Sequence, residues 1–204
     1  MSDLLVESDG RLRCAWSSGD QMYERYHDEE WGRGTTADGP LFEKIVLEGF
    51  QAGLAWITIL RKRERFREVF AGFDPALVAE FGEPEVLDLL DDAGIIRHRG
   101  KIDAAINNAG RALDMIEEFG SIAAYVWPQA PREATPRKSF EDIPALTDES
   151  TALSKDLKKR GWKFVGPTTM YAFMQAMGLV NDHLEGCWAR DACEAERVLI
   201  LERY

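Results

Sequence analysis

The chain has few cysteines and no long apolar run. Only three of its 204 residues are cysteine, Cys14, Cys187 and Cys193. A small odd number argues against a disulfide scaffold and favours a reducing compartment, so we expect a cytoplasmic protein. No stretch approaches 18 consecutive apolar residues, so we expect no membrane partner. The first residues also lack the basic and apolar regions of a signal peptide.

The chain has fewer basic than acidic residues, and its formal net charge is -11. At face value this disfavours a polyanionic partner such as nucleic acid. However, the windows 61–67, 97–101 and 155–163 together carry +11, so the remainder carries -22. Such segregation is typical of a groove that binds a polyanion, although solvated helix faces are the simpler alternative.

Strand-like alternation of β-branched residues is not found, and the apolar spacing is helical nearly everywhere. Proline and glycine positions divide the chain, because Asp38-Gly39-Pro40 marks a helix start and Gly53 a break. Four of the eight prolines fall in 128–146, which predicts a long loop. We therefore expect an all-α fold, in one or two lobes, with these helices: 22–31, 38–51, 56–70, two short ones from 74 and 83, 101–119, 121–127, 149–160, 167–177 and 193–204.

Two cysteines and two histidines form two local pairs near opposite ends of the chain. They are Cys14 with His27, and His183 with Cys187. Two Cys and two His make a closed tetrahedral set that suits a structural Zn²⁺. The pairs do not have the usual zinc-finger spacing, so buried thiols beside unrelated histidines remain the alternative.

A single carboxylate, Glu48, interrupts an apolar helix face formed by Leu41, Ile45, Ala52 and Ala55. A buried Glu needs hydrogen-bond partners, which makes it a candidate for site chemistry unless it reaches water at the edge of the stripe. Aromatic residues crowd the same part of the chain and could stack on a flat, electron-poor heterocycle, or simply form core. They are Trp16, Tyr23, Tyr26, Trp31 and Trp56.

Residues 157–169 predict a helix, a tight turn with Gly161 and Gly166, and a second helix that starts at Pro167. Free amides at that helix start, together with nearby lysines, suit a phosphate. The segment is similar to a helix–hairpin–helix clamp for the DNA backbone, and a plain corner between two helices is the alternative.

Taken together, the chain resembles the 3-methyladenine DNA glycosylase I family of bacterial alkylation-repair enzymes. The resemblance covers about residues 13 to 187. Its matching stretches are RCAW at 13–16, YHDEEWG at 26–32, LEGFQAGLAWIT at 47–58, DAGIIRHRGKI at 92–102, KKRGWKFVG at 158–166, GLVNDH at 178–183 and GC at 186–187.

The resemblance implies an all-α helix–hairpin–helix glycosylase fold with one structural zinc that joins the N- and C-terminal segments. The ligands would be Cys14, His27, His183 and Cys187. The implied glycosylase domain is 13–187, with an N-terminal extension at 1–12 and a C-terminal helical tail at 188–204.

The resemblance also implies a reaction, the excision of 3-methyladenine from alkylated double-stranded DNA by base flipping. The base would be released free and an abasic site left, without lyase activity, by a protein that we expect to be a monomer. Glu48 would be the catalytic residue, in a base-binding pocket of Tyr26, Trp16, Trp56, Tyr23 and Trp31. The DNA contacts would come from Leu54, Gly161, Lys163, Gly166 and Thr168.

Three rival functions remain at this stage. A zinc-dependent hydrolase would need an open coordination site, which a Cys₂His₂ set does not leave. A non-catalytic DNA-backbone binder would explain the hairpin but not Glu48 among aromatics. A glycosylase with another base preference is compatible with the same aromatics. Asp182 is a further candidate to assist the reaction, although it adjoins the expected ligand His183.

Overall fold

The computed structural model describes residues 3–204 and is mostly helical, as the spacing predicts. The helices are α1 Gln21–Glu29, α2 Asp38–Gln51, α3 Trp56–Leu60, α4 Arg63–Val69, α5 Pro75–Val78, α6 Glu83–Asp91, α7 Arg99–Phe119, α8 Ile122–Val126, α9 Asp148–Lys159, α10 Pro167–Ala176 and α11 Arg190–Leu201. Within residues 3–204, no helix combines the length and the apolar character needed to cross a bilayer.

The local signals place most helix ends correctly. The Asp20 side chain accepts hydrogen bonds from the Met22 and Tyr23 amides and so caps α1. The α2 helix ends at Gln51, and Gly53 follows with a φ of 83°, a conformation that favours glycine. Gly49, also expected to weaken α2, lies inside it because the Phe164 side chain packs where a Cβ would be.

Three features differ from the expectation. The stretch expected as one helix at 56–70 forms two, α3 and α4, with Arg61 and Lys62 between them. The N-terminal segment forms an antiparallel hairpin, β1 Leu4–Val6 with β2 Leu12–Cys14, too short to show an alternating pattern. The first two residues of the expected extension 1–12 lie outside the described residues. Asp38 does not cap its own helix, because its carboxylate accepts from the Ile122 amide and thereby joins α2 to the start of α8.

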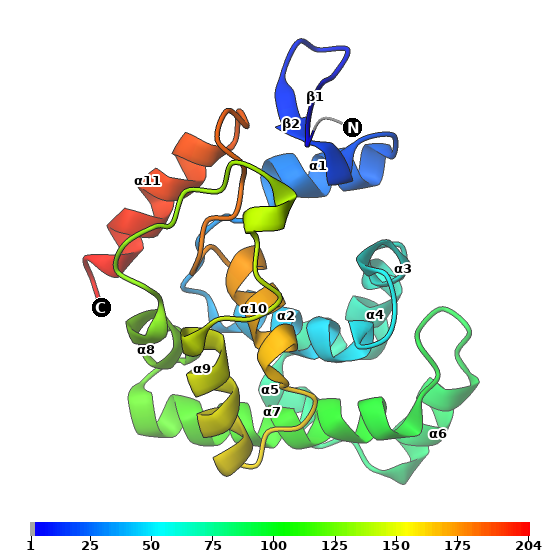
Figure 1. The fold of residues 1–204 in the computed structure, drawn as a ribbon. Coiled ribbons are helices and arrows are strands. Elements are labelled where there is room, and N and C mark those ends of the chain that lie inside the picture. Colours follow the sequence, from blue (N-terminus) through cyan, green and yellow to red (C-terminus); the bar gives the residue numbers. More distant parts are fainter. Residues whose placement is uncertain (1–2) are drawn as a thin grey trace.

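The core is built around α2, which packs against α7, α8 and α10 (Figure 1). Six apolar side chains of α2 are at most 3 % exposed, and burial of each contributes about 1.5–3 kcal/mol. They are Leu41, Phe42, Ile45, Val46, Leu47 and Phe50. The central place of α2 puts any polar group on its inner faces, Glu48 included, inside the molecule.

The hairpin between α9 and α10 is braced by the long helix α7. Asn108 is buried; its Nδ2 donates to the Lys163 carbonyl over 2.9 Å, and its Oδ1 accepts from the Lys163 amide over 2.8 Å. Neighbouring Asn107 donates to the carbonyl of Gly161 at the exposed turn. Side chains of α7 therefore fix the conformation of the turn.

We expect Asn108→Ala to lower the free energy of unfolding by about 2–3 kcal/mol, because both bonds to Lys163 are lost and its amide and carbonyl stay unpaired. Asn107→Ala is the matched control and should cost about 1 kcal/mol or less, since water can reach the carbonyl of Gly161. Urea unfolding of the two variants measures both effects. Equal losses would contradict the brace.

Candidate functional site

A cavity of about 170 Å³ lies between the N-terminal segment and helices α2, α3 and α10. Its walls include all five aromatic residues predicted for the pocket, together with Glu48; the full lining is Trp16, Tyr23, Tyr26, Trp31, Glu48, Gln51, Trp56, Ala172 and Gln175. Drug-sized ligands occupy about 300–1,000 Å³, so this cavity suits a smaller molecule such as one base.

Glu48 is buried, with an exposed fraction of 5 %, so the alternative that it reaches bulk water at the edge of the stripe is wrong. Its Oε1 lies 3.0 Å from the Lys44 Nζ, one turn earlier on α2. That ammonium also donates to the Tyr26 hydroxyl over 2.7 Å and lies 3.4 Å from the centre of the Trp56 ring. Burial lowers the pKa of Lys44, whereas the charge of Glu48 opposes this shift. Burial, reinforced by Glu48, raises the pKa of Tyr26, so this side chain is a neutral phenol.

The predicted aromatic residues share the cavity but have different structural partners. Trp16 makes edge-on contacts with Tyr23, Tyr26 and Trp31. The Tyr23 hydroxyl accepts from the Ile57 amide and so fixes the start of α3. Trp56 contacts Tyr26, and its buried indole N–H has no acceptor within residues 3–204. The cavity is therefore walled by rings that hold one another in place.

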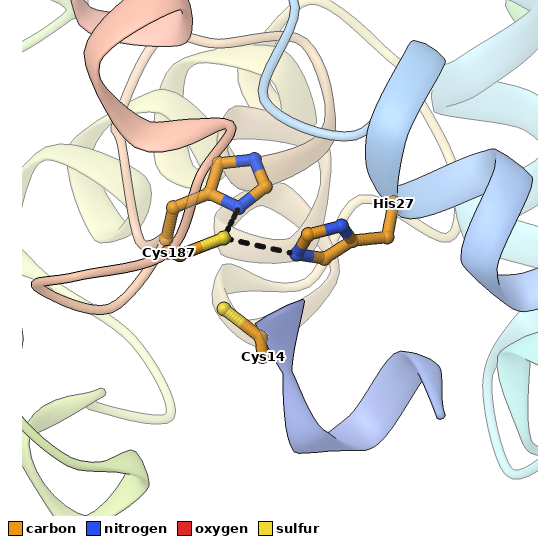
Figure 2. A group of neighbouring side chains, drawn as sticks. Cys14, His27 and Cys187 are labelled. Atoms are coloured by element: carbon orange, nitrogen blue, oxygen red, sulfur yellow. Dashed lines mark hydrogen bonds between the residues drawn. The ribbon is translucent and has the colours of Figure 1, made fainter. Parts of the chain in front are cut away.

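The four expected metal ligands, though far apart in sequence, converge directly behind this wall. Donor atoms of Cys14, His27, His183 and Cys187 all lie within 4.8 Å of one another, and all four residues are buried. The Cys187 Sγ is 3.4 Å from His27 Nε2 and 3.5 Å from His183 Nδ1. Figure 2 shows Cys14 and His27 directed toward the Cys187 sulfur.

This donor set fits a tetrahedral zinc. With Zn–S near 2.3 Å and Zn–N near 2.0–2.1 Å, tetrahedral geometry separates S and N ligands by about 3.5 Å, as found here. The other imidazole nitrogens are held as metal-binding histidines require: His27 Nδ1 is 2.8 Å from Asp28 Oδ1, and His183 Nε2 is 3.0 Å from the carbonyl of Trp31. The hydrogen bond from Cys14 holds the pKa of Cys187 well below its usual range, which favours a thiolate.

The residues expected to contact DNA lie at two loops. Leu54 is exposed in the turn between α2 and α3. Lys101 holds that turn, because its Nζ donates to the carbonyls of Phe50 and Ala52 over 2.9 and 2.7 Å. Since Lys101 is buried in this way, it is not one of the surface charges that the sequence pattern indicated.

The α9–α10 hairpin presents the other expected DNA contacts. Gly161 has a φ of 85°, Lys163 is exposed, and Gly166 is the N-cap of α10, with Thr168 in its first turn. The Lys163 amide is already bonded to Asn108, so only its ammonium remains to contact a phosphate.

The basic windows at 61–67 and 155–163 differ in how many of their positive side chains are ion-paired. In 61–67 every arginine is ion-paired: Arg61 with Asp20, Arg63 with Glu30, Arg65 with Asp92 and Glu68, and Arg67 with Glu43 and Glu64. In contrast, within residues 3–204 no carboxylate pairs with the exposed lysines of the hairpin window, which are Lys155, Lys158, Lys159 and Lys163. The formal charge of residues 61–67 therefore overestimates the free positive charge on this part of the surface.

The cavity also contains residues that sequence reasoning missed. These are Gln51, Ala172 and Gln175 of the lining. Lys44, also not expected, lies behind the lining, where its Nζ contacts Tyr26, Glu48 and Trp56. The sequence does indicate Lys44, because it lies four residues before Glu48 and therefore on the same helix face. Gln175 comes from α10, which only the tertiary fold brings to α2.

Asp182, the alternative acid, lies outside the cavity lining. It is buried and accepts from the side chains of Arg137, Tyr171 and Gln175. With three donors on its two oxygens, it is a structural acceptor that joins α10 to the loop at 137.

A larger, more open cavity of about 590 Å³ lies beside α4 and α6. Its walls carry several carboxylates, including Glu85, Asp88 and Asp91, and its only aromatic residue is Phe81. It lacks the stacked rings and the single buried carboxylate of the smaller cavity, which therefore remains the candidate site.

Comparison with known proteins shows the family of the chain. The family model for methyladenine glycosylase matches residues 16–190. DNA-3-methyladenine glycosylase 1 of Escherichia coli (strain K12) is 52% identical over 177 residues, which are 86% of this chain and 95% of the relative. The DNA-3-methyladenine glycosylase of Haemophilus influenzae is 44% identical, over 86% of this chain and 96% of its own.

Solved structures agree as well. A crystal structure of 3-methyladenine DNA glycosylase I superposes with a TM-score of 0.83 at 51% identity and covers 87% of this chain and 99% of its own. A Staphylococcus aureus structure that addresses 3-methyladenine recognition gives 0.83 at 34% identity and covers 87% and 96%. The chain belongs to the methyladenine glycosylase family.

Proposed function

We propose that the chain acts in base-excision repair and hydrolyses the N-glycosidic bond of 3-methyladenine in alkylated double-stranded DNA. The observation that carries this proposal is a buried carboxylate, Glu48, in an aromatic cavity that suits one base. Relatives named for this activity support it, and one solved structure is of a 3-methyladenine DNA glycosylase I in complex with 3-methyladenine. We also propose a cytoplasmic location, because the relatives named for this activity come from bacteria.

In the proposed reaction the damaged nucleotide leaves the stack and enters the cavity. Extrusion costs a few kcal/mol, less for a damaged base. The exposed Leu54 would fill the gap in the duplex, while the hairpin residues Gly161, Lys163, Gly166 and Thr168 hold the backbone.

The methylated base is a cation, so its bond to the sugar is already weak. Glu48 Oε2 has no partner among residues 3–204 and would accept a hydrogen bond from the base, while the rings of Trp16 and Trp56 bind its charged faces. Water then adds to the sugar carbon as the carbon–nitrogen bond breaks. The electron pair of that bond leaves with the base, which becomes neutral, and the proton lost by the water passes to solvent, so an abasic site remains.

We further propose a monofunctional enzyme without lyase activity. The lysine nearest the cavity is Lys44, and its ammonium is held by Tyr26, Glu48 and Trp56, which leaves it poorly placed for attack on a sugar. The cavity, Leu54 and the hairpin all come from one chain, which supports a monomer. The glycosylase unit would be 13–187, within a helix–hairpin–helix fold.

Zinc would be held by Cys14, His27, His183 and Cys187 as a closed four-ligand site. When bound, the metal would supply a cross-link between the two ends of the chain. The reaction itself would be carried out by Glu48 and the aromatic walls.

We expect Glu48→Gln to reduce release of 3-methyladenine about 100-fold, because a hydrogen bond to a charged group is worth up to about 3 kcal/mol. Glu43→Gln is the matched control on the same helix, since Glu43 pairs with Arg67 away from the cavity, and it should retain activity. Chromatography of bases released from methylated DNA measures both. Full activity of Glu48→Gln would refute the assignment, and a different released base would favour the rival preference.

We expect the purified protein to carry one zinc per chain, and Cys187→Ala to lose it and melt at a lower temperature, because structural zinc contributes directly to folding. Cys193→Ala is the control: this buried thiol is not among the four clustered ligands, and its variant should keep the metal. Elemental analysis and thermal melting measure the two effects. Equal zinc content in both variants would contradict the proposed ligand set.

We expect Lys163→Ala to weaken DNA binding and to reduce the slope of log K against log salt by about 0.9, the value for one phosphate contact. Arg65→Ala should leave the slope unchanged, because Arg65 is paired with Asp92 and Glu68. Binding to a duplex at several salt concentrations measures the slopes. A slope that changes in Arg65→Ala and not in Lys163→Ala would instead place the DNA beside α4.

A further inference from the structure

One buried charge beside the cavity, Lys44, has no role in the proposed reaction. Lys44 has a side chain that is 6 % exposed, and it is not part of the cavity lining. Its ammonium nevertheless contacts three residues of that lining, Tyr26, Glu48 and Trp56. A buried lysine costs stability unless its charge is compensated, so its position directly behind the cavity wall calls for an explanation.

Lysine can only donate hydrogen bonds, and this fixes the direction of the bond to Tyr26. The Tyr26 oxygen must accept from the Lys44 Nζ, 2.7 Å away. Its own O–H then has to donate elsewhere, and within residues 3–204 it has no acceptor. Because Tyr26 lines the cavity, that proton is available to a ligand acceptor.

The same ammonium fixes the polarity of Glu48. It forms an ion pair with Oε1 at 3.0 Å, and a carboxylate paired in this way offers a ligand only acceptors. Oε2 has no donor among the described side chains. The cavity therefore offers a ligand one acceptor, on Glu48, beside one donor, on Tyr26.

We propose that Lys44 is a positioning residue that sets this hydrogen-bond polarity and thereby selects bases with an amino group beside a ring acceptor. An adenine edge has this pattern, an N6 amino donor next to the N7 acceptor, whereas guanine shows two acceptors, O6 and N7. A carbonyl in place of the amino group would face the Glu48 carboxylate and be repelled. The inference rests on the proposed function and adds the group that determines its selectivity.

Binding of free bases tests the inference without DNA. The probes are 3-methyladenine and 3-methylhypoxanthine, which carries a carbonyl where the first carries the amino group. Tryptophan fluorescence follows each titration. We expect the wild-type protein to bind 3-methyladenine at least 100-fold more tightly, because a site built for one hydrogen-bond pattern strongly rejects the other.

Lys44→Gln should reduce this ratio to below tenfold. A glutamine amide can also accept, so the Tyr26 hydroxyl can turn toward it, and Glu48 loses its ion-pair partner. Lys44→Met is the second variant, and it should show the same loss. Lys44→Arg, which like lysine only donates, should retain the preference. Lys62→Gln is the matched control, because it removes an ammonium whose partner is the Ala93 carbonyl, away from the cavity lining, and it should keep the wild-type ratio.

The outcomes separate this inference from the proposed function. A wild-type protein that binds neither base would overturn both. Wild-type selectivity below threefold would overturn the polarity argument whatever the variants do. A selective wild type whose Lys44→Gln and Lys44→Met variants are equally selective would overturn the role of Lys44 and leave the proposed function intact.

Discussion

The structure depends on the meeting of four side chains from the two ends of the chain. Cys14 and His27 flank the segment that carries most of the cavity aromatics, and His183 and Cys187 lie in the loop before α11. A buried imidazole needs hydrogen-bond partners, and here the rings of His27 and His183 lie 3.4 and 3.5 Å from the Cys187 Sγ. Because Trp31 contacts the rings of both His27 and His183, the wall of the cavity is joined directly to this cluster.

The walls of the cavity consequently come from two parts of the structure. One part is the aromatic segment held by the four-residue cluster, and the other is α2 with α10, held by the central core. Lys44 spans them, since it comes from α2 and donates to Tyr26 of α1. A base recognised between two such parts meets a preorganised site, which limits the ordering that binding must otherwise bring about.

Sequence patterns predicted most of the helices and the break after α2, because capping residues, glycine and apolar spacing act locally. They did not predict what depends on tertiary contacts. Asp38 bonds to α8 rather than capping α2, and Lys101 holds the turn before Leu54 rather than facing solvent. Likewise, the arginines at 61–67 are neutralised by carboxylates distant in sequence, which net charge within a window cannot reveal.

The proposed function requires one methylated base to bind in the aromatic cavity against Glu48. A crystal structure of the protein with free 3-methyladenine is the most direct test. We expect the base between the rings of Trp16 and Trp56, with its amino group at hydrogen-bond distance from Glu48 Oε2. A base bound in the larger cavity beside α4 and α6, or in the aromatic cavity with its amino group turned away from Glu48, would contradict it.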